Sequence, residues 1–336
     1  MIKKVFFFFL LLFFSTGCGE ISTYPSQNSN LTEDTLTINA YFSQTSGNYN
    51  LGGGIDKYLI NDILNAKSSI NLAIYSLTND RIRDALIKAH QKGVDVKIFT
   101  DDREFFKDDM KVLKSAGIFV ANDENTNALM HNKFMIIDKK RVWSGSCNYT
   151  YYAFYRNNEN LVKMNGFKIA EVYEEQFREL LEGTYVEKAY VSDGIEIYFS
   201  PEDDFQQRLL SLIEGARYKI DFLAFAFTDK SVADAIIKKA ASGVTVRGVM
   251  DEKQNAYQSS SVFKYLKSSG ISVKLDKNKF TMHDKVFIID DTVVTGSYNF
   301  TKKANDTNNE NSIVVHNADF SKLYEREFKK IYEKAN

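Results

Sequence analysis

One polar motif occurs twice in this chain, once in each half. Each copy reads His-x-Lys-x-x-x-x-Asp, and the residues are, in order, His131, Lys133, Asp138 and His283, Lys285, Asp290. Each copy is followed by Gly-Ser-x-Asn and then by Asn-Asn-Glu-Asn, which supply Gly145, Ser146, Asn148, Glu159 and Gly296, Ser297, Asn299, Glu310. Paired His, Lys, Asn and Glu side chains could hold a phosphate between two imidazoles. The motifs therefore indicate phosphodiester chemistry.

The two lysines and two asparagines suit the charge of a phosphodiester, which repels nucleophiles. Lys133 and Lys285 can bring positive charge to the non-bridging oxygens, and Asn148 and Asn299 can add neutral donors. An imidazole has an ordinary pKa of about 6.5. One neutral histidine can therefore attack phosphorus, while the other, protonated, donates to the leaving oxygen and then activates water. The residues alone leave open which histidine attacks.

The acidic members of the motifs have two different predicted roles. Glu159 and Glu310 can each accept a hydrogen bond from the far ring nitrogen of a histidine, which would fix its tautomer and orientation. Asp138 and Asp290 fall where an apolar run ends, so we expect them at hairpin turns, anchoring local structure and not touching substrate.

A metal site is not expected. The paired lysines already supply the positive charge that a cation would bring to His131 and His283. With Cys18 and Cys147 as the only cysteines, a cysteine metal cluster is excluded by number. We expect no cofactor.

The elements that must position these residues repeat with them. On a strand, residues i and i+2 point the same way, so His131 and Lys133 should project together. Residues 70–75 form a near-continuous apolar run, as expected for a strand buried on both faces. A helical stripe follows after cap candidates Thr78 and Asn79, then a second strand after Gly93. This strand-helix-strand order predicts a parallel or mixed sheet covered by helices.

Similarity between the halves extends beyond the motifs. Tyr41-Phe42-Ser43 recurs as Tyr198-Phe199-Ser200, and the period is about 150 residues over the whole chain of 336. We predict one domain over 37–182, a join at 183–193 and a second domain over 194–336. Each would carry half of one site at their interface, so we expect a monomer.

The N-terminus reads as a targeting segment. Lys3 and Lys4 precede an apolar run of ten residues, and small residues lead to Cys18. We predict a lipoprotein-type signal peptide over 1–18, acylation of Cys18, and a flexible tether over 19–36. This would make the protein exported and membrane-anchored. The alternative is an ordinary cleaved signal and a secreted or periplasmic protein.

The duplicated motifs resemble the signature of the phospholipase D superfamily, and the resemblance covers about residues 38 to 334. It implies two tandem α/β sandwich domains, each a mixed sheet flanked by helices. A pseudo-twofold axis would relate them, with the active site at their interface. It also implies metal-independent cleavage through a phosphohistidine. In two-motif members the first histidine is commonly the nucleophile, so by analogy His131 attacks and His283 protonates the leaving group.

The superfamily includes lipid and nucleic-acid enzymes, so the substrate needs separate evidence. A lipid anchor would place the site beside phospholipid, and a net charge of −1 disfavours strong nucleic-acid binding. An aromatic cluster follows the first motif and could line an acyl surface, stack bases, or simply pack: Tyr149, Tyr151, Tyr152, Phe154, Tyr155. We expect a phospholipase D-type phosphoric diester hydrolase acting on phospholipid. An exported endonuclease is the alternative, and a non-catalytic phosphate-binding surface protein is the second alternative.

Overall fold

The computed structural model describes residues 24–25, 36–45, 54–192 and 194–336. The predicted signal peptide and Cys18 lie outside the described residues, as does most of the predicted tether. Two residues of that tether segment form the short strand β1 (Tyr24–Pro25), which pairs with the edge of the first sheet. In the described part of the chain, no helix combines the length and apolarity that a membrane crossing requires.

The N-terminal domain is built on an eight-stranded mixed sheet in the order β1-β2-β8-β7-β6-β3-β4-β5. Strands β3, β4 and β5 are parallel, and the remaining pairs are antiparallel. The strands after β1 are β2 (Thr37–Phe42), β3 (Ser69–Ile74), β4 (Asp95–Thr100), β5 (Phe119–Asn122), β6 (Lys133–Ile137), β7 (Arg141–Gly145) and β8 (Asn160–Asn165).

The C-terminal domain repeats this sheet in the order β13-β12-β11-β14-β15-β16-β10-β9. Its strands are β9 (Tyr190–Ser192), β10 (Ile195–Ser200), β11 (Lys219–Ala224), β12 (Thr245–Met250), β13 (Ser272–Leu275), β14 (Lys285–Ile289), β15 (Thr292–Gly296) and β16 (Glu310–His316). The equivalent strands occupy equivalent places in the two sheets. The predicted α/β class, with two mixed sheets and a repeated topology, is confirmed.

Helices cover both faces of each sheet. The outer helices are α1 (Asp56–Leu64), α2 (Asp80–Gln91) and α4 (Asp108–Ser115), and their equivalents α7 (Phe205–Gly215), α8 (Lys230–Ala241) and α10 (Phe263–Ser268). The long helices α6 (Phe167–Glu182) and α12 (Ala318–Lys334) follow the last strand of each repeat. Short helices near the strand ends are α3 (Asp102–Phe105), α5 (Tyr151–Tyr155), α9 (Glu252–Asn255) and α11 (Lys302–Asp306).

Helix α2 shows why the repeated sequence folds as it does. Asn79 caps it by accepting hydrogen bonds from the backbone N–H groups of Arg81 and Ile82. Its apolar stripe is buried, and the chain leaves it through Gly93, whose φ of 92° suits glycine. The predicted strand-helix-strand unit is therefore confirmed. The outer helices α1 and α7, which stand before it in each repeat, were not predicted.

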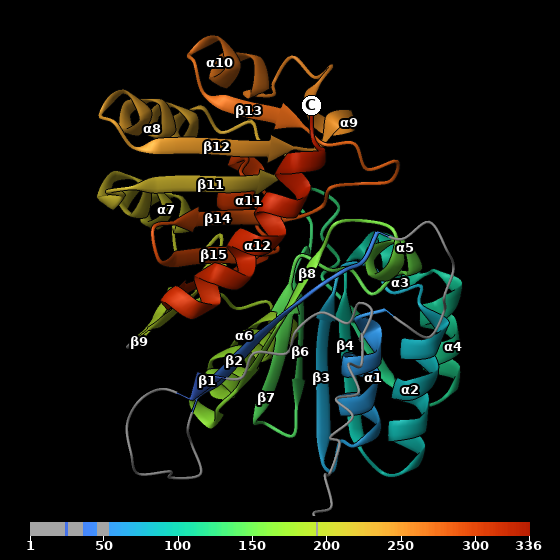
Figure 1. The fold of residues 1–336 in the computed structure, drawn as a ribbon. Coiled ribbons are helices and arrows are strands. Elements are labelled where there is room, and N and C mark those ends of the chain that lie inside the picture. The colour runs from blue at the N-terminus through green and yellow to red at the C-terminus, as the bar shows by residue number, and fades with distance from the viewer. Residues whose placement is uncertain (1–23, 26–35, 46–53, 193) are drawn as a thin grey trace, which may run out of the picture.

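The two domains share a central apolar core in addition to their own outer cores. This core packs α6 and α12 between the sheets, and aromatic rings run through it from one domain into the other. Phe134 lies 5.0 Å from Tyr173, and Tyr173 lies 5.3 Å from Phe199 of the C-terminal domain, as ring-centroid distances. Figure 1 shows the two sheets stacked one above the other with α12 against the upper sheet. The shared core fixes how the half-sites meet.

Candidate active site

The segments that lead into the two motif histidines are each tied to the opposite domain. The backbone N–H of His131 donates to the carbonyl of Asn309 at 2.9 Å, and that of His283 donates to Asn158 at 2.9 Å. Met130 forms an isolated parallel β-bridge with Asn309, and Met282 forms another with Asn158. The polypeptide thus places both histidines at the domain boundary, as predicted.

Each imidazole contacts a glutamate from the other domain. The Nδ1 atom of His131 lies 2.8 Å from Oε2 of Glu310, and Nδ1 of His283 lies 2.9 Å from Oε1 of Glu159. Since the carboxylates occupy the Nδ1 side, each Nε2 atom is left to face a substrate. The sequence predicted two glutamate–histidine contacts but did not indicate that they cross between domains.

The Gly-Ser pair of each motif holds the glutamate in place. Ser146 Oγ donates to Glu159 at 2.6 Å, and Ser297 Oγ donates to Glu310 at 2.6 Å. The preceding glycine is required because its neighbour strand passes very close. A Cβ atom on Gly145, whose φ is 126°, would lie 2.4 Å from the carbonyl oxygen of Asn160. Gly296 has the same environment beside Asn311.

The motif lysines are buried beside the imidazoles. Lys133 Nζ donates to the carbonyl of His131 at 2.7 Å, and Lys285 Nζ donates to that of His283 at 2.5 Å. Burial lowers the pKa of Lys133 to about 7 and that of Lys285 to about 8. A bound phosphate anion would favour the charged form of both amines, so the site is electrostatically matched to an anion.

Asn148 and Asn299 stand next to this centre. Their side-chain oxygens are buried and have no hydrogen-bond partner within the part of the chain that the structure describes. Both side chains are half-buried. Neither side-chain oxygen is therefore committed to a neighbouring protein group.

Burial also shifts the pKa values of the acid–base groups. It lowers the pKa of His131, against the opposing effect of Glu310, and lowers that of His283 well below its ordinary value together with Lys285 and Lys133. Burial raises the pKa of Glu159 to about 7. These shifts favour the neutral form of both rings without substrate, and a negatively charged ligand would favour the protonated form that proton donation requires.

An aromatic ring packs against each imidazole, and the two rings differ. Tyr75 lies 5.3 Å from His131 and Phe225 lies 4.7 Å from His283, measured between ring centroids. Both residues directly follow equivalent strands, β3 and β11. The hydroxyl group is thus present only beside His131. The equivalent positions of Tyr75 and Phe225, directly after the two strands, could have identified this pair of rings from the sequence.

Asp101 and Asp251 position the histidine segments and were missed by the sequence prediction. Asp101 Oδ2 accepts from the backbone N–H of Met130 at 3.0 Å, and Asp251 Oδ2 accepts from Met282 at 3.1 Å. Each carboxylate therefore holds the residue before a motif histidine. Their occurrence directly after the equivalent strands β4 and β12 could have identified them.

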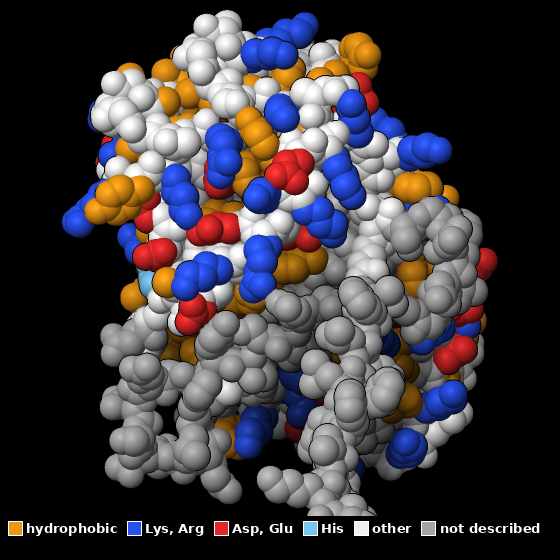
Figure 2. Space-filling model, in the orientation of Figure 1, with side chains coloured by type: hydrophobic (Ala, Val, Ile, Leu, Met, Phe, Trp, Pro, Cys, Tyr) orange, Lys and Arg blue, Asp and Glu red, His pale blue; other side chains and the backbone are white. Residues whose placement is uncertain are grey.

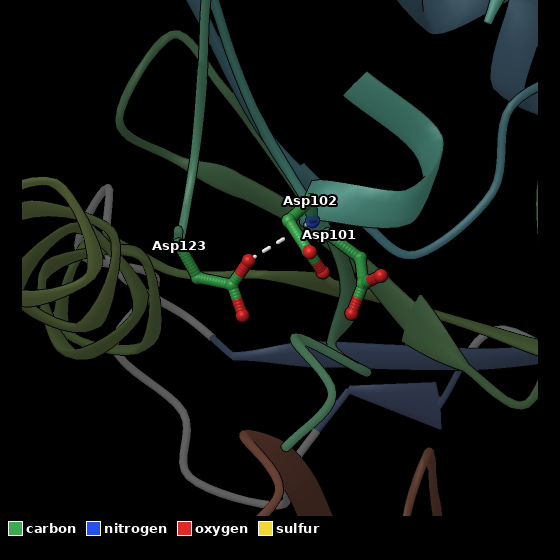
Figure 3. Close-up of side chains that lie close together, drawn as sticks. All are labelled: Asp101, Asp102 and Asp123. Carbon is green, nitrogen blue, oxygen red and sulfur yellow. Dashed lines mark hydrogen bonds between the residues drawn. The ribbon is translucent and has the colours of Figure 1, made fainter. Parts of the chain in front are cut away.

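Asp101 also belongs to an acidic cluster with Asp102 and Asp123, whose ligand-type oxygens lie within 4.8 Å of one another (Figure 3). Asp123 Oδ1 accepts from the backbone N–H of Asp102 at 3.0 Å. The C-terminal domain repeats this bond, from Glu252 to Asp276 at 2.8 Å. The repeated hydrogen bonds assign the carboxylates of Asp101 and Asp123 to loop anchoring.

Asp138 and Asp290 lie at hairpin turns and face away from the histidines. Asp138, with a φ of 54°, accepts from the backbone N–H groups of Lys67 at 2.9 Å and Ser68 at 2.7 Å. Asp290 accepts from the backbone of residues 217–219 in the same way. The arrangement agrees with the anchoring role predicted for both.

Most of the aromatic cluster after the first motif belongs to the core. Tyr149, Phe154 and Tyr155 are buried in the N-terminal domain, which agrees with the packing interpretation. Tyr152 is 56% exposed and lies edge-on to Phe280 of the other domain. The cluster therefore exposes one ring, that of Tyr152, and a second ring in part, that of Tyr151.

Comparison with known proteins identifies similar sequences and folds. Residues 59–181 and 209–332 match the family model described as cardiolipin synthase, PLD-like domain. The mitochondrial cardiolipin hydrolase of Chlamydomonas reinhardtii is 35% identical over 117 residues, which are 34% of this chain and 52% of that protein. A phospholipase D of Rickettsia prowazekii is 37% identical over 122 residues, which are 36% of this chain and 59% of that protein. The matches thus span between half and three fifths of these relatives.

A likeness in fold extends over nearly the whole chain. The crystal structure of phosphatidylserine synthase from Haemophilus influenzae superposes with a TM-score of 0.66 and covers 88% of this chain and 86% of that one. The sequences are 13% identical, so this likeness concerns the fold alone. The superposition includes both domains of this chain.

Proposed function

The chain belongs to the phospholipase D superfamily, and from this premise we propose that it is a phosphodiester hydrolase that releases phospholipid head groups through a phosphohistidine. The observation that carries the proposal is the paired contact of His131 with Glu310 and of His283 with Glu159 across the domain boundary. Two imidazoles held in this way, each with a buried lysine that bonds the backbone of the same histidine, suit a phosphate diester.

The proposed first step forms a phosphorus–nitrogen bond. Nε2 of neutral His131 attacks phosphorus, while Lys133 and Lys285 neutralise the non-bridging oxygens. The phosphorus–oxygen bond to the head group breaks, and His283 gives its Nε2 proton to the departing alcohol oxygen. Glu159 stabilises the imidazolium that exists before this transfer.

In the second step water replaces the histidine. His283, now neutral, takes a proton from water as the oxygen attacks phosphorus, and the bond to His131 breaks. The product is a phosphate monoester, and His283 is again protonated. Asn148 and Asn299 would donate to the non-bridging oxygens during both steps.

A phospholipid substrate is supported by the relatives named phospholipase D and cardiolipin hydrolase. We further propose that the protein is exported and held at a membrane through acylated Cys18, as a monomer that contains both half-sites. The alternative is an exported endonuclease with the same site. The exposed ring of Tyr152, with the half-buried Phe280 edge-on to it, is the observation that favours base stacking.

The decisive experiment uses the chain without residues 1–18, in the presence of EDTA. Head-group release from mixed phospholipid vesicles is compared with cleavage of single- and double-stranded DNA and RNA, with His283→Ala as the blank. Head-group release alone supports the proposal. Cleavage of nucleic acid alone replaces it with the endonuclease, and no turnover of either substrate would favour the phosphate-binding protein.

A further inference from the structure

A lysine-rich groove of about 310 Å³ lies at the domain boundary, lined by residues of both domains. Its lining includes Lys277, Lys279, Phe280, Lys330 and Lys334 from the C-terminal domain and Asn158 from the N-terminal domain. Figure 2 shows Lys and Arg side chains gathered at the right of the upper domain, where α12 ends and the loop to β14 runs.

The groove adjoins the catalytic centre through Asn158, whose carbonyl accepts the hydrogen bond from the backbone N–H of His283. Asn278 closes its base, since its side chain donates to Asn158 Oδ1 at 2.8 Å and to the carbonyl of Arg156 at 2.9 Å. The guanidinium of Arg156 lies 4.8 Å from the ring centroid of Phe280. The groove is thus built by contacts between the domains.

The positive charge of this groove is largely uncompensated. Among the described residues, Lys277, Lys279 and Lys334 are exposed and form no ion pair. The one acidic lining residue, Asp276, accepts from the backbone N–H groups of Glu252 and Asn278 with its two oxygens. Lys330 is paired with Glu327 at 3.1 Å. Three lysines therefore remain for an anionic ligand.

The equivalent region beside His131 carries acidic residues at positions where the groove carries lysines. Asp123 and Asp276 make the same loop-anchoring bond, which places Glu124 where Lys277 stands in the other repeat. The N-caps of α6 and α12 are Gly166 and Asn317, and counting from them places Glu179 where Lys330 stands.

Carboxylates on the acidic side also influence one another. Burial, together with the nearby Asp203 and Glu179, raises the pKa of Glu202 to about 7. Lys188 contacts Glu179, but no cluster of lysines corresponds to residues 277–279 in this described region. The two half-sites are therefore similar at their histidines but differ in the charged residues around them, with lysines on one side and carboxylates on the other.

We propose that the lysine groove is a subsite for a second phosphate carried by the head group of the phospholipid substrate; this inference rests on the function proposed above. A nucleic-acid strand cut internally would run past both histidines and meet repulsion beside His131. A lipid with its extra negative charge on one side of the scissile bond meets only the basic side. The difference in charge between the two sides of the site therefore favours such a lipid over a nucleic-acid strand.

The groove also orients the substrate. Its lining residue Asn158 bonds the backbone of His283, so in this proposal the head group that the groove holds departs toward His283. The departing oxygen is then near the imidazole that must protonate it, and His131 is left to attack from the opposite side. The subsite and the assigned roles of the two histidines thus agree.

The test measures selectivity with lipids dispersed in neutral detergent micelles, which removes the effect of vesicle charge. The ratio of kcat/KM for a lipid whose head group carries a phosphate to that for phosphatidylcholine is determined for the wild type. In the variant Lys277→Gln, Lys279→Gln, Lys334→Gln we expect this ratio to fall about tenfold, because each exposed ion pair contributes modestly. The matched control is Lys264→Gln, Lys267→Gln, Lys329→Gln, which removes equal charge outside the groove.

Several outcomes would overturn the subsite. An unchanged ratio in the groove variant, or an equal fall in the control, would show that the lysines do not read the head group. Impaired cleavage of a single-stranded oligonucleotide by the groove variant, without a change in the lipid ratio, would assign the groove to nucleic acid. If the wild type cleaves bis(p-nitrophenyl) phosphate but neither lipid, the proposed substrate has failed and the subsite inference falls with it.

Discussion

The imidazole of His131 lies 2.8 Å from the carboxylate of Glu310, which stands 179 residues later in the chain and in the other domain. His283 and Glu159 form the reciprocal pair. Each half-site is therefore completed by the opposite repeat. This crossing explains why the shared apolar core and the bonds that tie His131 to Asn309 matter for chemistry as well as for folding.

Replacing Glu310 by glutamine should lower kcat by at least about 10²-fold, because an amide cannot hold the His131 tautomer as a carboxylate does. Glu159→Gln should act similarly through His283. The measurement is kcat on bis(p-nitrophenyl) phosphate, with thermal unfolding to verify the fold. Retention of wild-type kcat in either variant would remove the crossed pairs from the mechanism.

The two histidines should differ when the leaving group needs no acid. In His283→Ala, p-nitrophenolate can depart unaided, so we expect a burst of about one equivalent and a phosphorylated residue 131 in mass spectrometry. His131→Ala should give no burst. Phosphorylation of His283 in the His131→Ala variant would instead exchange the two roles.

Activity should decrease as pH rises through 7 to 8. A lysine amine is charged below its pKa and neutral above it, and burial lowers the pKa of Lys133 to about 7 and that of Lys285 to about 8. Substrate phosphate is then held less well, so kcat/KM should fall mainly through KM. A profile of kcat/KM from pH 5 to 9 that stays level to its alkaline end would contradict this account.

Chelation should leave turnover unaffected. The buried amines of Lys133 and Lys285 supply charge at the site, and in the acidic cluster both oxygens of Asp101 and one oxygen of Asp123 accept backbone hydrogen bonds. Steady-state rates with and without EDTA provide the measurement. Loss of activity in EDTA that a divalent ion restores would show that the lysines are insufficient.

Asp138 should contribute to stability. Its backbone hydrogen bonds lower its pKa despite partial burial, so the contribution is present above the unfolded pKa of about 3.9 and disappears as pH falls through the folded pKa. Asp138→Ala should reduce the free energy of unfolding by about 1–3 kcal/mol at pH 7. Urea denaturation measures this, with exposed Asp95→Ala as control. An equal loss in both variants would contradict the anchoring role.

The duplication made much of the fold predictable, and it supplied the residue types that we propose for the site. Repeated apolar runs predicted β3, β4 and α2. The aspartates at the ends of the apolar runs after the motif lysines predicted the turns at Asp138 and Asp290. Short-range periodicity carries this information because side-chain burial alternates with the local element.

Contacts between distant segments were not predictable in the same way. Each glutamate follows the histidine of its own repeat at a similar spacing, so sequence distance does not reveal that Glu310 contacts His131. Likewise, Lys277 and Lys334 meet at one groove only after α12 folds back along the sheet. Such relationships depend on tertiary packing, which leaves no periodic trace.

The crossed histidine–glutamate pairs determine how an inactivating substitution in one repeat affects the other repeat. A single substitution at Glu310 injures the half-site whose histidine is encoded far upstream, so neither repeat can serve as an intact spare for the other. Two differently inactivated copies of the chain should complement each other only if they exchange whole domains. The two repeats therefore share one fold, but each depends on the other for a complete half-site.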